Sequence, residues 1–481
     1  MNFLKKHWYP LTVFLILLVA GIFRFYHFPN RCGLAYDQAR DVLVGREALR
    51  QGKIPLVGPF TSAANVVYGP QWFWVLASFI ALKPDFIFLP WFILGVLYVV
   101  IVWLMIKIGE MVGDRELGLL AGLVTAFSPM QIWQSLSLTT PNFVALMSVL
   151  AMITMLKYFK TKNPLFAFLL GTILAASVNI HLQAVGLLFL IPVTIFFGWK
   201  HRLRAILLFS FGFLLQLIPL IIFELKMGFY NFQGVIGYLT YGQYQAEGQT
   251  SWLVYIFSSW PKLWAKVVGG EVRLAYFQIA GVIFLFVRLA LKKRLPKTIL
   301  ALGMSFLLIF ISLRFYRGAK FESYYAFVNP FILFFSAWFI WRVYQWQKAV
   351  AFLFLLLLLT GSLRLNSDYY QVEKNSYPLL KNWQEILVNR FPGQKFAVYD
   401  DRFQSQDKTV SLALVLAAGG LIDDDGVKIG ISRDPGAISD KTFYYQGYSL
   451  TEITTIKKEG DNWAFLNPSE IWQATQEWYD K

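Results

Sequence analysis

The chain has 481 residues, of which 57% are hydrophobic, 18% are aromatic and 15% are charged. Ordinary soluble domains carry about 25% charged residues, so this composition excludes a purely soluble protein. It predicts a polytopic α-helical membrane protein with room for one small soluble domain. The formal net charge of +16 invites a nucleic-acid partner. However, the basic residues recur in short clusters between apolar runs, which is typical of cytoplasmic loops. We therefore expect membrane lipids as partners, and no nucleic acid.

The first apolar run, Met1–Phe23, begins with basic residues and continues with an apolar core, as a secretory signal peptide does. It lacks a small-x-small cleavage site after that core, so we interpret it as a retained signal-anchor helix. Cys32 is the only cysteine. An intrachain disulfide and a cysteine-based metal site are therefore excluded.

A membrane-spanning helix needs about 20 apolar residues, and about eleven segments satisfy this criterion. The predicted spans are 8–24, 85–106, 117–134, 142–158, 164–180, 183–199, 204–223, 274–291, 297–313, 324–341 and 348–364. The aromatic segment 70–82 is too short to cross and is expected to lie in the membrane interface. With this count all the basic clusters fall on one side, which predicts a plasma-membrane protein with its N-terminus inside and its C-terminal domain outside.

The first external loop, 24–84, carries three acidic residues, among them Asp37 and Asp41, and five arginines. If Asp37–Arg50 is helical, Asp37 and Asp41 lie one turn apart on the same face, and Arg40 can tether Asp37. Two like charges at this spacing raise the pKa of at least one carboxylate unless a cation is close. The residues alone leave two interpretations open, which are a catalytic loop and a solvated juxtamembrane helix with ordinary ion pairs.

Two motifs in this loop resemble those of the GT-C superfamily of integral membrane glycosyltransferases, in the branch of protein O-mannosyltransferases and lipid A aminoarabinose transferases. The loop of that branch opens with Asp-Glu, a small residue and often Arg; here Asp37, Ala39 and Arg40 match, and Gln38 replaces the Glu. Tyr68–Trp74 (YGPQWFW) resembles the branch's His-Pro-Pro element that ends in aromatic residues, without its His. The resemblance covers about 8–365.

The resemblance implies an inverting glycosyltransferase in which Asp37 is the catalytic base. A sugar on a polyprenyl phosphate already has a good leaving group, so the enzyme has to orient an acceptor hydroxyl, accept its proton and stabilise the departing phosphate. Arg40, Asp41, Tyr68 and Gln71 are expected to contact substrate. Asp41 is open to three roles, which are binding the acceptor, orienting Arg40 and helping to hold a divalent ion. No cofactor is expected; a divalent cation is possible, although the Gln38 replacement argues against it.

A late external loop, 314–325, resembles the basic loop that precedes an aromatic-Pro helix in the same branch. Its candidate phosphate contacts are Arg317 and Lys320, with Tyr324 beside them. The alternative is that these cations extend to lipid headgroups. His181 lies between two predicted spans and is either structural or a substrate contact. An outward-facing cavity lined jointly by Asp37 and Lys320 would favour an enzyme.

The loop 224–270 is rich in Gly, Tyr, Gln and Trp, which suits sugar faces and an interfacial aromatic belt equally well. From about 366 the composition changes to that of a small extracytoplasmic α/β domain. Helices are predicted at 377–390 and 409–418, and strands at 395–399 and 443–449. The acidic run Asp423–Asp425 lacks the rest of an EF-hand and favours an ordinary turn over a calcium site.

The sequence therefore predicts a transmembrane catalytic domain at 1–365 and an extracytoplasmic domain at 366–481. The predicted activity is transfer of a sugar from a polyprenyl-phosphate donor to a hydroxyl of a glycan, lipid or protein acceptor on the outer face of the membrane. The alternative is a transporter or flippase of a lipid-linked glycan. A carrier needs polar or charged groups at mid-membrane in interrupted helices, whereas the charges here collect near one surface.

Overall fold

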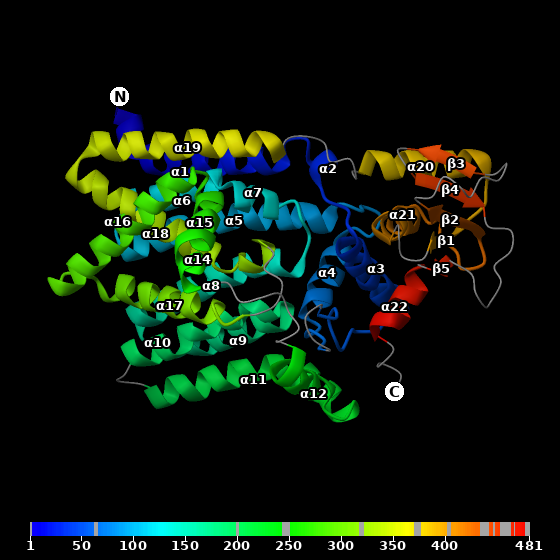
Figure 1. The fold of residues 1–481 in the computed structure, drawn as a ribbon, viewed down its shortest axis with the longest axis horizontal. Coiled ribbons are helices and arrows are strands. Elements are labelled where there is room, and N and C mark those ends of the chain that lie inside the picture. Colours follow the sequence, from blue (N-terminus) through cyan, green and yellow to red (C-terminus); the bar gives the residue numbers. More distant parts are fainter. Residues whose placement is uncertain are drawn as a thin grey trace.

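The computed structural model describes residues 2–61, 66–198, 202–242, 251–316, 322–369, 377–401, 406–432, 442–445, 448–452, 463–465 and 467–476. Figure 1 shows long helices running side by side, with α3 and α4 at one end of the bundle, next to a small sheet. The protein is thus a polytopic helical membrane protein with a C-terminal α/β region, as the composition predicts.

Within the described residues, six helices are long and apolar enough to cross a membrane by length and composition. They are α1 (Asn2–Phe25), α5 (Leu89–Val112), α8 (Thr140–Thr161), α11 (Arg202–Lys226), α16 (Val272–Leu291) and α19 (Lys348–Tyr369). Shorter helices occupy the other predicted spans. They are α6 (Arg115–Phe127), α7 (Pro129–Gln134), α9 (Leu165–Ile180), α10 (Leu190–Phe197), α17 (Lys297–Leu313) and α18 (Asn329–Trp346). The count of eleven spans stays a prediction.

Two of the predicted spans are interrupted. The segment 117–134 is divided between α6 and α7, because Ser128 accepts a bond from the Gln131 N–H and Pro129 starts a new helix. The segment 183–199 begins as the 3-10 helix η1 (Leu182–Phe189) and becomes α-helical only at α10. By contrast, α18 is buried along all residues from Asn329 to Trp341. A helix that is apolar all round is buried, and this one lies in the core of the bundle.

The predicted loop 224–272 contains short helices where it is described. They are α12 (Tyr230–Gly237), η3 (Tyr238–Gly242), α14 (Trp252–Val254), η4 (Tyr255–Ser259) and α15 (Trp260–Val268). The helix α15 packs into the bundle, and the hydroxyl of Ser128 donates to the backbone carbonyl of Val267 over 2.5 Å. In Figure 1 it runs across the direction of the long helices.

The first external loop forms three helices, α2 (Phe28–Arg31), α3 (Tyr36–Gln51) and α4 (Gln71–Leu82). The predicted helix at 37–50 is confirmed by α3, which ends at Gly52, where a positive φ of 64° suits glycine. The short helix α4 packs against α3, and the pair lies between the bundle and the C-terminal region (Figure 1).

The C-terminal region is a five-stranded sheet in the order β3-β4-β2-β1-β5, flanked by helices. The strands are β1 (Phe396–Asp401), β2 (Val427–Ser432), β3 (Thr442–Tyr445), β4 (Tyr448–Glu452) and β5 (Trp463–Phe465). The helices are α20 (Tyr377–Arg390), α21 (Gln406–Ala418) and α22 (Pro468–Gln476). β1 and β2 are parallel, which requires the crossover that α21 provides. The single predicted strand at 443–449 is wrong, because β3 and β4 are two antiparallel partners.

The sheet region is attached to the first external loop by specific contacts. The backbone N–H of Tyr36 donates to the Asp407 carboxylate over 3.0 Å, and the Ser411 hydroxyl donates to the Leu34 carbonyl over 2.8 Å. Both partners belong to α21, and both bonds lie at the start of α3. Ala35, the N-cap residue just before α3, has a methyl side chain that cannot accept a hydrogen bond. Asp407 accepts one from the first turn instead, although it lies far along the sequence.

Candidate functional site

The first turn of α3 presents Asp37 to solvent and buries Asp41. The side chain of Asp37 is 68% exposed, whereas that of Asp41 is 3% exposed. The Arg40 guanidinium lies between them, with Nη1 2.8 Å from an Asp37 oxygen and Nη2 2.7 Å from an Asp41 oxygen. The predicted tether between Arg40 and Asp37 is present, and only Asp37 of the two acids is available to a substrate.

The buried carboxylate of Asp41 has both of its oxygens occupied. Arg40 donates to Oδ1 through Nε as well, over 2.9 Å, and the indole N–H of Trp72 donates to Oδ2 over 2.7 Å. Burial raises the pKa of Asp41 to about 6; the charge of Arg40 opposes the rise, and Asp37 adds to it. This geometry favours the orienting role for Asp41 over direct acceptor binding.

Gln38, which replaces the acid of the family pattern, is used in packing. Its Oε1 accepts from the indole N–H of Trp91 over 3.0 Å, and its Nε2 donates to the Ser137 hydroxyl over 3.3 Å. Among the described residues, no three His, Cys, Asp or Glu side chains come together as a metal site requires. Arg40 already binds both Asp37 and Asp41, so a divalent ion at these two carboxylates would have to displace it.

The second motif passes close to the end of α9. The Gly69 N–H donates to the Asn179 carbonyl over 2.8 Å, and a Cβ on Gly69 would lie only 2.6 Å from the Asn179 side chain, so glycine is required. Burial raises the pKa of Tyr68, and the nearby Tyr324 and Tyr316 add to the rise, with a smaller contribution from Asp37. Gln71 is directed elsewhere, because it is buried and donates to the Gln216 carbonyl on α11.

His181 lies between two tyrosine rings, which come from two different loops. Its ring centroid is 5.6 Å from that of Tyr68 and 5.1 Å from that of Tyr324. Nδ1 lies 3.2 Å from the Thr140 hydroxyl, and burial lowers the pKa of His181 to about 3. The imidazole is therefore neutral at physiological pH, which suits an uncharged hydroxyl better than a phosphate. Tyr324 belongs to η5 (Glu322–Tyr325), so the late loop approaches the first one.

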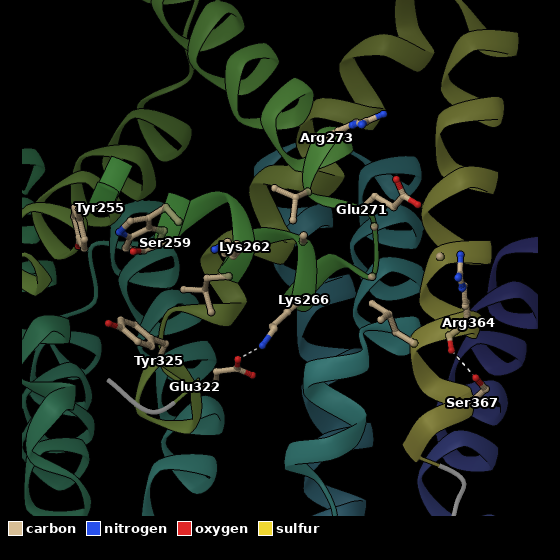
Figure 2. A pocket seen from close by; sticks show the side chains of 18 residues that line it. Tyr255, Ser259, Lys262, Lys266, Glu271, Arg273, Glu322, Tyr325, Arg364 and Ser367 are labelled. Carbon is tan, nitrogen blue, oxygen red and sulfur yellow. Dashed lines mark hydrogen bonds and ion pairs between the residues drawn. The ribbon is translucent and has the colours of Figure 1, made fainter. Parts of the chain in front are cut away.

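A large basic cavity opens beside η5 (Figure 2). It has a volume of about 1190 Å³ and lies between α15, α16, α19 and η5. Its charged lining residues are Lys262, Lys266, Glu271, Arg273, Glu322 and Arg364. In Figure 2 the ammonium group of Lys266 points toward Glu322, with which it forms an ion pair. Lys262, Arg273 and Arg364 form no ion pair with another described residue, so the cavity keeps an excess of positive charge.

An apolar groove of about 470 Å³ shares one lining residue, Trp260, with the basic cavity. It runs between α15, α16 and α17 and is lined by Ile256, Trp260, Trp264, Ile279, Val282, Ile283, Phe286, Val287, Gly303, Phe306, Leu307, Phe310 and Phe335. This lining contains no charged side chain. Trp260 lines both the groove and the cavity, so the two are neighbours. A ligand that fits both has an anionic head and an apolar chain.

Several predicted site residues differ from expectation or stay untested. Arg317 and Lys320 lie outside the described residues. Asp37 does not line the basic cavity, whereas Tyr325, next to Tyr324, does. The sequence reasoning missed the four cavity cations, Lys262, Lys266, Arg273 and Arg364. A signal existed, because the predicted topology puts all four on the outer side, against the positive-inside pattern.

The acidic run in the sheet region is engaged by protein groups. Asp424 accepts from the Asn467 amide over 2.9 Å and from the Ser469 hydroxyl over 2.7 Å. Asp423 pairs with Lys395 over 3.4 Å. These bonds favour the ordinary acidic turn over a calcium site.

No protein-family model matches the chain, and no curated protein matches it in sequence. Solved structures match its fold. ArnT from Cupriavidus metallidurans in the apo state aligns with a TM-score of 0.63 at 12% identity, covering 93% of this chain and 97% of that one. The same protein bound to undecaprenyl phosphate aligns at 0.53 and 13% identity, covering 86% and 76%.

The apo oligosaccharyltransferase of Archaeoglobus fulgidus aligns with a TM-score of 0.55 at 13% identity, covering 82% of this chain and 59% of that one. This chain thus spans about three fifths of the length of the oligosaccharyltransferase. ArnT and the oligosaccharyltransferase are both GT-C superfamily glycosyltransferases. The GT-C fold predicted from the two loop motifs is therefore confirmed.

Proposed function

We propose that this chain, which has the GT-C fold, is a membrane glycosyltransferase that transfers a sugar from a polyprenyl-phosphate carrier to an acceptor hydroxyl. The observation that carries the proposal is that a basic cavity and an uncharged groove lie next to each other, with Trp260 lining both. A phosphate is bound by lysine and arginine side chains, and a prenyl chain needs an apolar channel. A water-soluble nucleotide sugar needs a basic cavity for its phosphates, but it has no prenyl chain that would need an apolar groove.

The residues at the start of α3 support a single-displacement reaction. The acceptor oxygen attacks the anomeric carbon, the bond from that carbon to the phosphate oxygen breaks, and the acceptor proton passes to Asp37. The lipid phosphate leaves with both electrons of the broken bond, and cations of the cavity stabilise its charge. A single displacement inverts the anomeric configuration. Asp37 is the one exposed carboxylate of the motif, which supports it as the base.

The remaining site assignments are also part of this proposal. Tyr68, His181 and Tyr324 form a cluster of aromatic rings that suits a sugar ring. Arg317 and Lys320 are proposed as further phosphate contacts because they belong to the loop that ends in η5. The ArnT structure that contains undecaprenyl phosphate supports a lipid-phosphate ligand for this fold.

The proposed orientation has the N-terminus inside, and both Asp37 and the sheet region on the outer side of the plasma membrane. The distribution of basic clusters supports it. The division at 365/366 is supported by the sheet, which contains only strands beyond that point. The acceptor is a hydroxyl of a glycan, a lipid or a protein.

The test of the proposed function is transfer in vitro by the purified chain from a panel of sugars on polyprenyl phosphate. At least one donor is expected to give a glycosylated product and free polyprenyl phosphate in equal amounts. A matched panel of nucleotide sugars is expected to give no product. Movement of a lipid-linked glycan across proteoliposomes, with no transfer from any donor, would instead support the flippase alternative.

The apolar groove gives a prediction about the length of the donor chain. Replacing Leu307 or Ile283 by tryptophan narrows the groove, so KM for a long-chain donor is expected to rise about tenfold, corresponding to the loss of roughly two buried methylene groups. KM for a donor with a short, ten-carbon chain is expected to stay unchanged. Ile311→Trp, on the same α17 helix but outside the groove, is the matched control. An equal change in KM for both donors would contradict the assignment.

A further inference from the structure

A continuous set of hydrogen bonds joins the two sequence motifs of the first external loop. The indole N–H of Trp72, on α4, donates to Asp41, whose other oxygen accepts from Arg40. Arg40 in turn pairs with Asp37 over 2.8 Å. The order is thus Trp72, Asp41, Arg40, Asp37, running from the core to the exposed carboxylate.

The burial of these groups separates those that can touch a substrate from those that cannot. Trp72 is fully buried and Asp41 is 2% exposed, whereas Asp37 is open to solvent. Both oxygens of Asp41 are already bonded within the protein. Trp72 is further fixed by the ring of Phe143, with centroids 5.8 Å apart. Asp41 and Trp72 can therefore affect a reaction at Asp37 without touching the substrate, through Arg40 and, for Asp41, also through its charge.

We infer that Trp72, Asp41 and Arg40 are positioning residues that fix the orientation of Asp37 and limit how far Arg40 neutralises it; this inference rests on the proposed function. A guanidinium that is shared between two carboxylates is held more strongly by the one it binds with two nitrogens. Here that one is Asp41, bound by both Nε and Nη2. Without a charged Asp41, Arg40 would pair with Asp37 alone, which makes Asp37 a weaker base.

The charges around Asp41 give this arrangement a pH dependence. Asp41 interacts with Arg40 and Asp37 on its own helix, α3, and with the indole N–H of Trp72 on α4. The nearest charged group of α21 is Asp407, which binds the backbone N–H of Tyr36 at the start of α3. Burial raises the pKa of Asp41 to about 6, and the bonds from Arg40 and Trp72 oppose that rise. As pH falls through about 6, Asp41 gains a proton and releases its hold on Arg40. Turnover is therefore expected to fall with a midpoint near pH 6.

The experiment measures kcat and KM against pH for the full chain and three variants. Trp72→Phe removes one hydrogen bond to the charged form of Asp41, which raises the pKa of Asp41. The fall in turnover on the acid side of the pH profile, the acid limb, is therefore expected to have its midpoint about one pH unit higher. Asp41→Asn is expected to remove that limb and to lower kcat at pH 7.5 about 30-fold. Arg40→Lys keeps the charge but not the two-nitrogen contact and is expected to lower kcat about tenfold. KM for donor and acceptor is expected to change less than twofold in all three.

Trp74→Phe is the matched control, because the indole of Trp74 donates to the Pro55 carbonyl and not to Asp41; its pH profile is expected to equal that of the unmodified chain. An unmoved acid limb in Trp72→Phe, or a rise in acceptor KM at constant kcat in Asp41→Asn, would overturn the inference. If Trp72→Phe fails to fold, the profiles of Asp41→Asn and Arg40→Lys decide. Full turnover by Asp37→Asn would show that Asp37 is not the catalytic base. That result would contradict the proposed function, and it differs from the outcomes that would overturn the positioning role of Trp72, Asp41 and Arg40.

Discussion

Replacing Asp37 by asparagine is expected to lower the rate of sugar transfer about 10³-fold. The amide keeps the size of the side chain and its contact with Arg40 but cannot accept the proton of the acceptor, and general-base catalysis contributes about 10²- to 10⁴-fold. Binding of polyprenyl phosphate is expected to stay within twofold, because Asp37 does not line the basic cavity. Single-turnover transfer and lipid binding, measured on the same preparation, give both quantities.

The matched control for Asp37→Asn is Asp85→Asn, an exposed acid in the turn between α4 and α5. It has the same change of charge and is expected to keep the unmodified rate. A transfer rate for Asp37→Asn within a factor of five of the unmodified rate would show that another group accepts the proton. A joint loss of transfer and of lipid binding would show that the variant has lost its fold.

Removing the cations of the basic cavity is expected to raise KM for the donor more than it lowers kcat. Each of Lys262→Ala, Arg273→Ala and Arg364→Ala removes one charge-assisted contact, worth about 1.5 kcal/mol, and should raise donor KM about tenfold. The triple variant should raise it by several hundredfold. Inorganic phosphate is expected to inhibit the unmodified chain and to inhibit the triple variant less. Titration of undecaprenyl phosphate, read by intrinsic tryptophan fluorescence, measures the affinity directly.

Arg288→Ala is the control for these charge removals. Arg288 belongs to the same helix as Arg273 but lies at its opposite end, over the ring of Phe284. Donor KM for this variant is expected to equal the unmodified value. If the triple variant binds undecaprenyl phosphate as tightly as the unmodified chain, the phosphate is held elsewhere and the cavity has another role.

The helices and the position of the first loop could be predicted because each depends on a local property of the sequence. Apolar runs give the spans, and the Asp37–Arg50 pattern gives α3. The breaks inside two spans were missed, although Ser128-Pro129 is a recognisable signal, since Ser caps a helix and Pro favours its first turn. A length criterion for spans counts apolar residues and does not register such a break.

The environment of the candidate site depends on contacts between distant residues and could not be predicted in the same way. Asp37 and Asp41 are equivalent in a helical pattern, and only the packing of Trp72 and α4 buries Asp41. Lys262, Lys266 and Arg273 lie close together in the sequence, whereas Arg364 reaches the same cavity from α19, 91 positions after Arg273. The aromatic residues of 224–270 predict a sugar-binding or interfacial loop, and this pattern gives no sign that Lys262 and Lys266 line a cavity.

The bond from the Tyr36 N–H to Asp407 has a consequence for biosynthesis. The two residues are 371 positions apart, so a growing polypeptide inserts nearly all of its membrane helices before Asp407 leaves the ribosome. Until then the backbone N–H of Tyr36, in the first turn of α3, lacks the acceptor that Asp407 provides. Chains that end before Asp407 lack this bond, and the first turn of their α3 helix is expected to be less stable by about 1 kcal/mol.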